Sequence, residues 1–183
     1  QPAAASEVVE KAGHIDVLCA NLAARARGGR SATEIDDEVW ADMFDIMVHP
    51  LPRLVRAVLP QMMERQSGKI LVVGSATGLK ALPGATAYSA ARSAQVGYVR
   101  SVGAEVAPHN IQVNLIAQNF VENPIYFSEK FQQTEMFQTM MAGVPAGRLA
   151  TAREDAMLAV FLASDESDFF VGQAIPFSGG WTQ

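Results

Sequence analysis

Cysteine, histidine and long apolar runs are scarce in this chain of 183 residues. Its single cysteine, Cys19, cannot form a disulfide within the chain, and it falls in a short apolar run that predicts a buried strand. The three histidines, His14, His49 and His109, are scattered without the spacing of metal ligands, so we predict no metal site. No apolar run approaches the roughly 18 residues that a membrane-spanning helix requires.

Charge is also limited. Charged residues make up 18% of the chain and the net charge is −5, a balance that argues against nucleic-acid binding. The chain does not begin with Met, and no basic segment followed by an apolar one opens it, so we predict no secretory signal. Together with the unpaired cysteine, this favours a cytoplasmic location. Because 49% of the residues are hydrophobic, we expect residues 1–183 to form a single domain with a sizeable core.

Short, continuously apolar runs alternate with stretches of helical spacing. Strands are predicted at residues 15–20, 69–73, 110–116 and 172–177, and helices at residues 2–12, 36–65, 86–107, 129–141 and 153–163. Pro50 and Pro52 are expected to kink or split the second helix. Strands that are apolar on both faces and alternate with helices indicate a parallel sheet covered on both sides, which is a doubly wound α/β fold.

Polar side chains suited to proton transfer lie near the predicted strand ends. Ligands of such folds bind where the strands end, and Asn21, Ser75 and Gln118 all follow strands at that edge. Tyr88 and Arg92 open the next helix after Ser75, and their spacing of four residues places them on one helix face. A hydroxyl, a phenol and a guanidinium in this order predict an acid–base site.

These motifs resemble those of the short-chain dehydrogenase/reductase superfamily, and the matching segments run nearly from end to end. The segments are Ile15-Asp16-Val17-Leu18 with Asn21-Leu22-Ala23, the serine strand ending in Gly74-Ser75, the Tyr88 helix, the strand Asn110-Ile111-Gln112-Val113-Asn114, and the closing Gly172-Gln173 and Gly179-Gly180. The resemblance implies a Rossmann-like parallel sheet flanked by helices. It also implies that the chain lacks the N-terminal strand-helix-strand portion with which members of the superfamily begin.

Four departures from the superfamily pattern concern the nicotinamide cofactor. The glycine-rich dinucleotide turn is not in this chain, and Arg92 stands where the superfamily has the lysine that contacts the nicotinamide ribose. Gln118-Asn119 replaces a Pro-Gly pair, and Met47 stands at the position of a helical Asn. Together these departures remove much of what would hold a nicotinamide.

The combination resembles the halohydrin dehalogenases, an offshoot of the superfamily that uses no nucleotide. The resemblance implies that Ser75, Tyr88 and Arg92 are catalytic and that no cofactor or metal is needed. It further implies a halide site at Gln118, Asn119, Phe120 and Val121, a substrate pocket lined by Thr77, Leu79, Leu82, Pro83, Tyr126 and Phe127, and a homo-oligomer, expected to be a tetramer.

In the implied reaction a vicinal haloalcohol closes to an epoxide and releases halide and a proton, and small anions open the epoxide in reverse. Tyr88, as phenolate, takes the hydroxyl proton, and Ser75 holds the substrate oxygen. A free phenol has a pKa of about 10, so a phenolate base near neutral pH needs a cation beside it. Arg92 suits this task because a guanidinium stays charged.

Two other functions fit the same sequence. The first is an NAD(P)-dependent alcohol or carbonyl oxidoreductase whose cofactor turn lies outside these residues. The second is a catalytically silent relative that serves as a binding or scaffold subunit. The first predicts binding of a nicotinamide cofactor, and the second predicts that Tyr88 and Arg92 can be replaced without loss.

Overall fold

Four parallel strands form the sheet at the centre of the molecule. The computed structural model describes residues 2–24 and 32–182. The strands lie in the order β1 (Val17–Ala20), β2 (Gly68–Val73), β3 (Ile111–Gln118) and β4 (Ala174–Phe177). Each neighbouring pair is parallel, with Ala20 opposite Val72 and Val73 opposite Ile116. The predicted α/β fold with a Rossmann-like parallel sheet is therefore confirmed.

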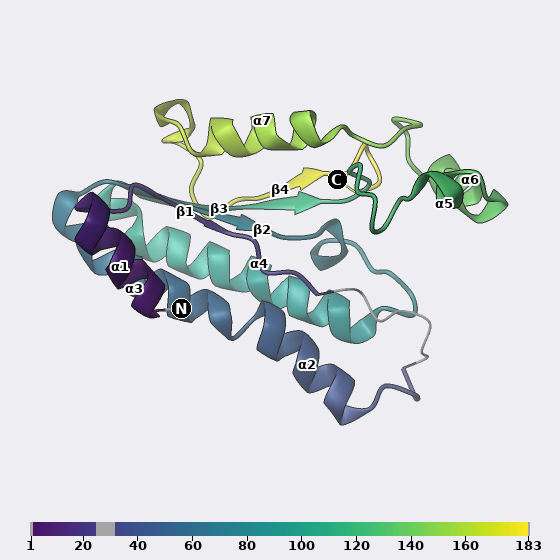
Figure 1. Ribbon diagram of the computed structural model, residues 1–183, viewed down its shortest axis with the longest axis horizontal. Helices are drawn as coiled ribbons and strands as arrows, with labels where there is room; N and C mark the ends of the chain where they lie inside the picture. Colours follow the sequence, from purple (N-terminus) through teal and green to yellow (C-terminus); the bar gives the residue numbers. More distant parts are fainter. Residues whose placement is uncertain (1, 25–31, 183) are drawn as a thin grey trace.

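Helices cover both faces of the sheet. The helices are α1 (Pro2–Ala12), α2 (Asp37–Met47), α3 (Pro50–Arg65), α4 (Thr86–Val106), α5 (Glu129–Gln132), α6 (Glu135–Ala142) and α7 (Ala152–Leu162), with short 3-10 helices η1 (Ala76–Gly78), η2 (Ala107–His109) and η3 (Asp165–Ser167). Figure 1 shows α1 to α4 on one side of the sheet and α7 on the other. Within the described residues, no helix is both long and apolar enough to cross a membrane.

The predicted break in the second helix lies between α2 and α3. The helix α2 begins after Asp36, whose carboxylate accepts a hydrogen bond from the backbone N–H of Val39 at 2.7 Å, and it ends at Met47. The next helix starts at Pro50, where a missing N–H costs nothing because the first turn of a helix leaves its N–H groups unpaired. The prediction of a split helix is confirmed.

Alternate residues of the strands belong to hydrophobic clusters on opposite faces of the sheet. On one face, β3 packs Val113, Leu115 and Ala117 against α3 and α4, and on the other face Ile116 packs against Leu162 of α7. Successive residues of a strand point to opposite faces, so this division fixes which face each later side chain of β3 occupies. By the same rule Gln118 belongs to the α7 face.

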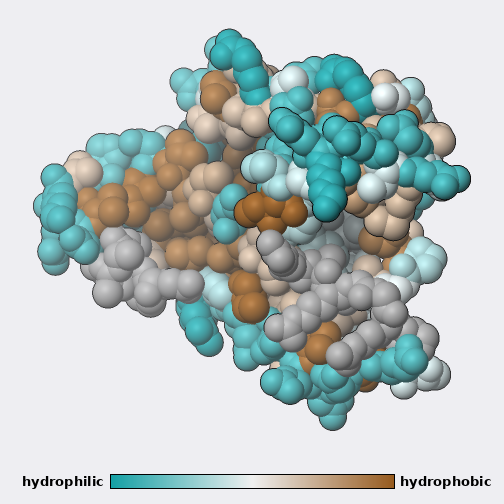
Figure 2. Space-filling model, turned by 45° about the vertical axis from the view of Figure 1, so that its right-hand side comes forward, coloured by the Kyte–Doolittle hydropathy of each residue, from teal (hydrophilic) through white to brown (hydrophobic). Residues whose placement is uncertain are grey.

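Cys19 was predicted to be buried, and that prediction was wrong. The thiol is exposed, because β1 is an edge strand of the sheet that the described residues form and only part of its surface is covered. Val17 on the same strand is 40% exposed. Other large hydrophobic side chains are exposed as well. Figure 2 shows a broad apolar area on the face in view, bordered by hydrophilic side chains.

Candidate active site

Ser75 lies at the carboxyl end of β2, where the strand passes into η1. The residue has an extended backbone (φ −146°, ψ 145°) and caps η1, with its Oγ accepting a hydrogen bond from the backbone N–H of Thr77. Its Oγ also lies 3.0 Å from the Thr77 hydroxyl. Both side chains are buried, so the two hydroxyls hold each other in one geometry.

The close approach of η1 to α4 brings the Ser75 segment against the helix that carries Tyr88 and Arg92. A Cβ at Gly78 would lie 2.9 Å from the Arg92 backbone oxygen, closer than real Cβ atoms pack. The Ser93 hydroxyl donates a hydrogen bond to the Gly78 carbonyl at 3.2 Å. Only glycine therefore fits at this contact.

Tyr88 and Arg92 are neighbours one turn apart on α4, as their spacing predicts. The guanidinium carbon of Arg92 lies 5.1 Å from the centroid of the Tyr88 ring. The ring is half-buried and packs with a cluster that includes Met43 and Met47 of α2. The cation and the phenol are therefore within Coulombic reach of each other.

Arg92 is a buried cation whose hydrogen bonds all go to neutral acceptors. Only 4% of its surface is exposed. Its Nη1 donates to the Leu22 carbonyl at 3.0 Å, to the Val73 carbonyl at 3.2 Å and to Gln95 Oε1 at 2.9 Å. Its Nε is buried and has no partner among the described residues. In the part of the chain that the structure describes, no carboxylate forms an ion pair with Arg92.

Gln95 is a member of this site that sequence reasoning missed. It is fully buried, and its Nε2 donates to the Met47 carbonyl at 2.7 Å. The sequence carried one signal for it, a polar residue three positions after Arg92 on an otherwise apolar side of the helix. The carbonyls of Leu22 and Val73 carry no signal, because any residue type supplies a carbonyl.

The predicted halide segment follows β3. Asn119 donates its backbone N–H to the Phe177 carbonyl at 2.9 Å, and its side-chain Oδ1 accepts the Phe120 N–H at 2.9 Å. Phe120 has a left-handed backbone (φ 57°), which is unusual for a residue with a side chain. Its ring centroid lies 6.4 Å from that of Phe127, whereas Val121 forms a parallel bridge with Ala150. Within this predicted halide segment, the backbone amides of Asn119 and Phe120 therefore already have partners.

The side chain of Gln118 lies on the α7 face, away from the face of β3 that packs on α4. With its amide nitrogen turned toward Asp155, it donates to the two carboxylate oxygens at 2.8 and 3.0 Å. Burial raises the pKa of this carboxyl. Gln118 therefore pairs with Asp155 of α7 on one face of the sheet, whereas Tyr88 belongs to α4 on the other face.

The residues predicted to form a substrate pocket differ in exposure. Thr77 adjoins Ser75, as expected, and Leu79 packs against the main core. Leu82 is 41% exposed and Tyr126 47% exposed. Pro83 is exposed as well, and Phe127 is half-buried beside Phe120. Among these residues, Thr77 is hydrogen-bonded to the predicted catalytic residue Ser75.

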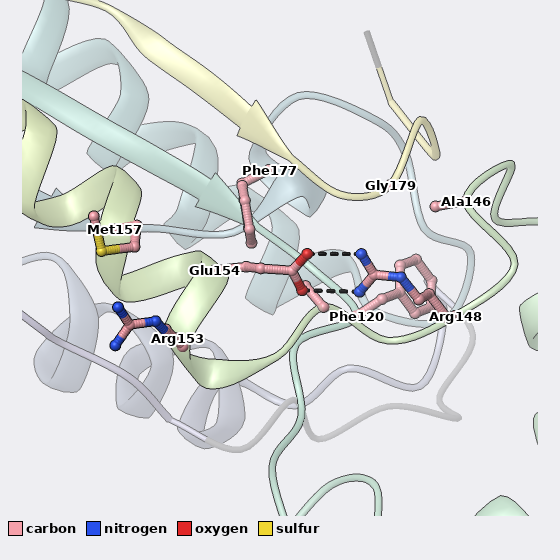
Figure 3. Close-up of a pocket in the computed structure, with 9 residues that line it drawn as sticks. Phe120, Ala146, Arg148, Arg153, Glu154, Met157, Phe177 and Gly179 are labelled. Carbon is pink, nitrogen blue, oxygen red and sulfur yellow. Dashed lines mark hydrogen bonds and ion pairs between the residues drawn. The ribbon is translucent and has the colours of Figure 1, made fainter.

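A separate cavity of about 460 Å³ lies between the ends of β3 and β4 and the start of α7 (Figure 3). It is lined by Phe120, Ala146, Arg148, Ala150, Arg153, Glu154, Met157, Phe177 and Gly179. Arg148 binds both carboxylate oxygens of Glu154, at 2.8 and 2.6 Å, and this ion pair lowers the pKa of Glu154 to about 2. Of the predicted site residues, the cavity shares Phe120 and none of the catalytic three.

Comparison with known proteins identifies the family. The family model described as Enoyl-(Acyl carrier protein) reductase matches residues 2–182. The chain belongs to the short-chain dehydrogenase/reductase superfamily of enzymes. It is 34% identical over 171 residues to a 3-oxoacyl-[acyl-carrier-protein] reductase FabG of Vibrio harveyi, covering 93% of this chain and 68% of that protein. With the FabG of Escherichia coli K12 it is 32% identical over 183 residues, covering 98% of this chain and 73% of that protein.

Solved structures of superfamily members show the same fold. One, named as a dehalogenation enzyme, has a TM-score of 0.93 and 34% identity, and the match covers all of this chain (100%) and 75% of that one. Another is halohydrin dehalogenase HheC bound to ethyl (2S)-oxiran-2-ylacetate, with a TM-score of 0.88 and 29% identity, covering 97% of this chain and 73% of that one.

Arg92, which stands where the superfamily has its ribose-contacting lysine, is only 4% exposed, and its Nη1 faces three protein acceptors. Within the described ranges there is no cluster of three or more side chains that could hold a metal ion.

Proposed function

We propose that this chain catalyses the reversible closure of vicinal haloalcohols to epoxides, with release of halide and a proton. The observation that carries the proposal is the charge of Arg92, which is buried beside Tyr88 and, among the described residues, donates its hydrogen bonds to neutral acceptors. A buried cation without a counter-ion favours a nearby anion. A phenolate at Tyr88 is one such anion, and a departing halide is another.

The distance between Arg92 and Tyr88 is short enough for their charges to interact. At an effective dielectric of about 20, a cation attracts a negative charge about 5 Å away by roughly 3 kcal/mol. The guanidinium carbon of Arg92 lies 5.1 Å from the centroid of the Tyr88 ring, so the cation can stabilise an anion there only while it stays close.

In the proposed reaction the Tyr88 phenolate accepts the proton of the substrate hydroxyl. The freed oxygen forms a bond to the adjacent carbon as the carbon–halogen bond breaks, and the halide leaves with the bonding electron pair. The Ser75 hydroxyl donates to the substrate oxygen, which requires the Thr77 hydroxyl to donate to Ser75 Oγ, 3.0 Å away. Tyr88 then passes its proton to water.

The halide is proposed to leave toward Phe120 and Val121. The side-chain oxygen of Asn119 now accepts the Phe120 N–H at 2.9 Å, and an anion entering there replaces that oxygen as the acceptor. The left-handed backbone of Phe120 suits this role, since such turns direct successive N–H groups to one point. Ring edges of Phe120 and Phe127 carry partial positive charge and complete the site.

The solved structures support the proposal, whereas the sequence relatives support a second candidate function. The two dehalogenase structures match at least 97% of this chain, and one of them binds an epoxide according to its name. The curated relatives are reductases of 3-oxoacyl groups on an acyl carrier protein. Their identity of 32–34% favours an NAD(P)-dependent oxidoreductase as the second candidate.

Turnover without nucleotide separates the two candidates. A small brominated alcohol is added to the protein with no nucleotide present, and bromide and acid release are followed. We expect the wild type to release bromide and acid in equal amounts, and we expect the same of Tyr98→Phe, a control at a tyrosine of α4 that packs against the main core. We expect none from Tyr88→Phe, whose fold circular dichroism should show to be unchanged. Turnover by Tyr88→Phe, or activity only with NADPH and a ketone, would exclude the proposal.

A further inference from the structure

Gln95 connects α2 to Arg92 through two hydrogen bonds inside the protein. The side chain is 0% exposed. Its Nε2 donates to the Met47 carbonyl at 2.7 Å, and its Oε1 accepts from Arg92 Nη1 at 2.9 Å. A buried amide without such partners would cost free energy, so both contacts stabilise one position of the side chain.

The Met47 carbonyl determines which way the amide faces. A carbonyl accepts hydrogen bonds and cannot donate them, so it requires the NH₂ end of Gln95. The oxygen end is then left to face Arg92, whose guanidinium only donates. The reverse orientation would set oxygen against oxygen and nitrogen against nitrogen. The last residue of α2 therefore fixes the acceptor that Arg92 meets on α4.

The acceptor at this position is also neutral. Arg92 Nη1 meets two backbone carbonyls and this amide oxygen, and none of the three carries a formal charge. A carboxylate in the same place would hold the guanidinium equally well but would cancel its charge. Neutrality at residue 95 thus keeps the positive charge available to the Tyr88 ring, 5.1 Å away.

We propose that Gln95 is a positioning residue, which holds the Arg92 guanidinium beside Tyr88 through a neutral acceptor and so preserves its charge for an anion at Tyr88. The inference rests on the proposed function in that Tyr88 is taken to act as an anion. Among the described residues of α4, Arg92 is the charged side chain that lies against the Tyr88 ring. From α2, that ring meets Met43 and Met47, while Asp45 pairs with His49 at the surface.

Two substitutions separate charge from position. Gln95→Glu retains an oxygen toward Arg92, adds a negative charge and loses the hydrogen bond to the Met47 carbonyl. Gln95→Met is similar in size and removes both hydrogen bonds without adding charge, so the effect of the charge is the difference between the two variants. The matched control is Gln112→Glu, which introduces the same charge at another buried glutamine, at the amino end of β3. Circular dichroism and thermal unfolding establish that each variant folds.

The pH profile of haloalcohol turnover distinguishes positioning from a structural role. With Gln95→Glu, we expect the acid limb of the kcat profile to move to higher pH by about one unit, with activity recovering above it, because a second negative charge nearby disfavours an anion at Tyr88. With Gln95→Met, we expect kcat to fall about 10- to 100-fold at unchanged KM, because Arg92 is then misplaced. Gln112→Glu should keep the wild-type profile.

An absorbance titration near the tyrosinate band tests the inference without turnover, with Tyr88→Phe subtracted to isolate Tyr88. We expect the Tyr88 component to move to higher pH in Gln95→Glu and not in Gln112→Glu. If the wild type releases no halide but this shift occurs, the proposed function fails and the role of Gln95 stands. If the component does not move, or if Gln95→Met keeps the wild-type kcat, the inference is overturned. Should Gln95→Glu not fold, the kcat of Gln95→Met decides alone.

Discussion

Replacing Gly78 with alanine tests whether the fit of η1 on α4 holds the site together. The added Cβ would lie 2.9 Å from the backbone oxygen of Arg92 and 3.0 Å from its carbonyl carbon. Both are backbone atoms in the middle of a long helix, so they cannot turn aside as a flexible side chain does. The η1 segment must therefore move outward, and Ser75 and Thr77 must move with it.

The size of the movement follows from ordinary contact distances. A Cβ normally rests 3.4–4 Å from its neighbours, so η1 must shift by roughly 0.5–1 Å to accept one here. A misplacement of about 1 Å at a reacting group costs on the order of 100-fold in rate. Overpacking of this kind costs about 1–3 kcal/mol of stability. We expect haloalcohol turnover to fall by about two orders of magnitude in a protein that still folds.

The matched control is Gly97→Ala on the same helix. A Cβ at Gly97 meets no atom within 4 Å. Alanine there should raise the free energy of unfolding by about 0.5–1 kcal/mol, because glycine weakens a helix interior. Turnover and urea unfolding of both variants are measured side by side. Wild-type kcat in Gly78→Ala, or equal effects of the two substitutions, would refute the idea that this contact positions Ser75.

Three further predictions follow from the halide segment, the α7 cap and the sheet edge. Phe120→Ala should weaken inhibition by bromide about fivefold, since a lost ring edge costs about 1 kcal/mol, and an unchanged inhibition constant would remove Phe120 from the halide site. The pKa of Glu154 is lowered from 4.5 to about 2 by its ion pair with Arg148. Its charge therefore stabilises the fold fully above pH 4.5 and loses that contribution as the pH falls toward 2, so Glu154→Gln should lower Tm at pH 7 but not near pH 2. A Tm difference that is the same at both values would contradict this. Cys19 should react with a thiol reagent in the native chain, because its side chain is exposed. Partial burial raises the pKa of its thiol, so the reaction should be slower at neutral pH than that of a free thiol and should speed up as the pH rises and the thiolate forms. A need for denaturant would contradict the exposure of Cys19.

The alternation of apolar runs and helical spacing was sufficient to predict the parallel sheet and most of its elements. The split at Pro50 was predictable because proline acts locally, through its missing N–H. The exposure of Cys19 was not, since the apolar run of β1 resembles that of an inner strand and the order of strands is set by contacts distant in sequence.

Side-chain direction at the site was the main quantity that sequence could not supply. A strand buried on both faces shows no alternation of polar and apolar residues, so nothing in β3 revealed that Gln118 would turn to Asp155 on α7. The spacing of Tyr88 and Arg92 did predict their contact, because a helix fixes the relation between residues four apart. Gln95 lay within reach of the same rule, but its partner at Met47 belongs to another helix.

Family membership and chemistry are carried by different parts of this molecule. The sheet and its covering helices are shared with reductases and dehalogenases alike, so an identity near one third describes the scaffold rather than the reaction. The chemistry depends on a few groups around α4. A lysine in the place of Arg92 would carry a compact charge on a flexible stem that extends readily to a ligand. The guanidinium present here is instead held inward by Leu22, Val73 and Gln95, and its charge reaches Tyr88 through space. A fixed cation beside a phenol supports removal of a proton, which is the step that the proposed closure of a haloalcohol to an epoxide requires.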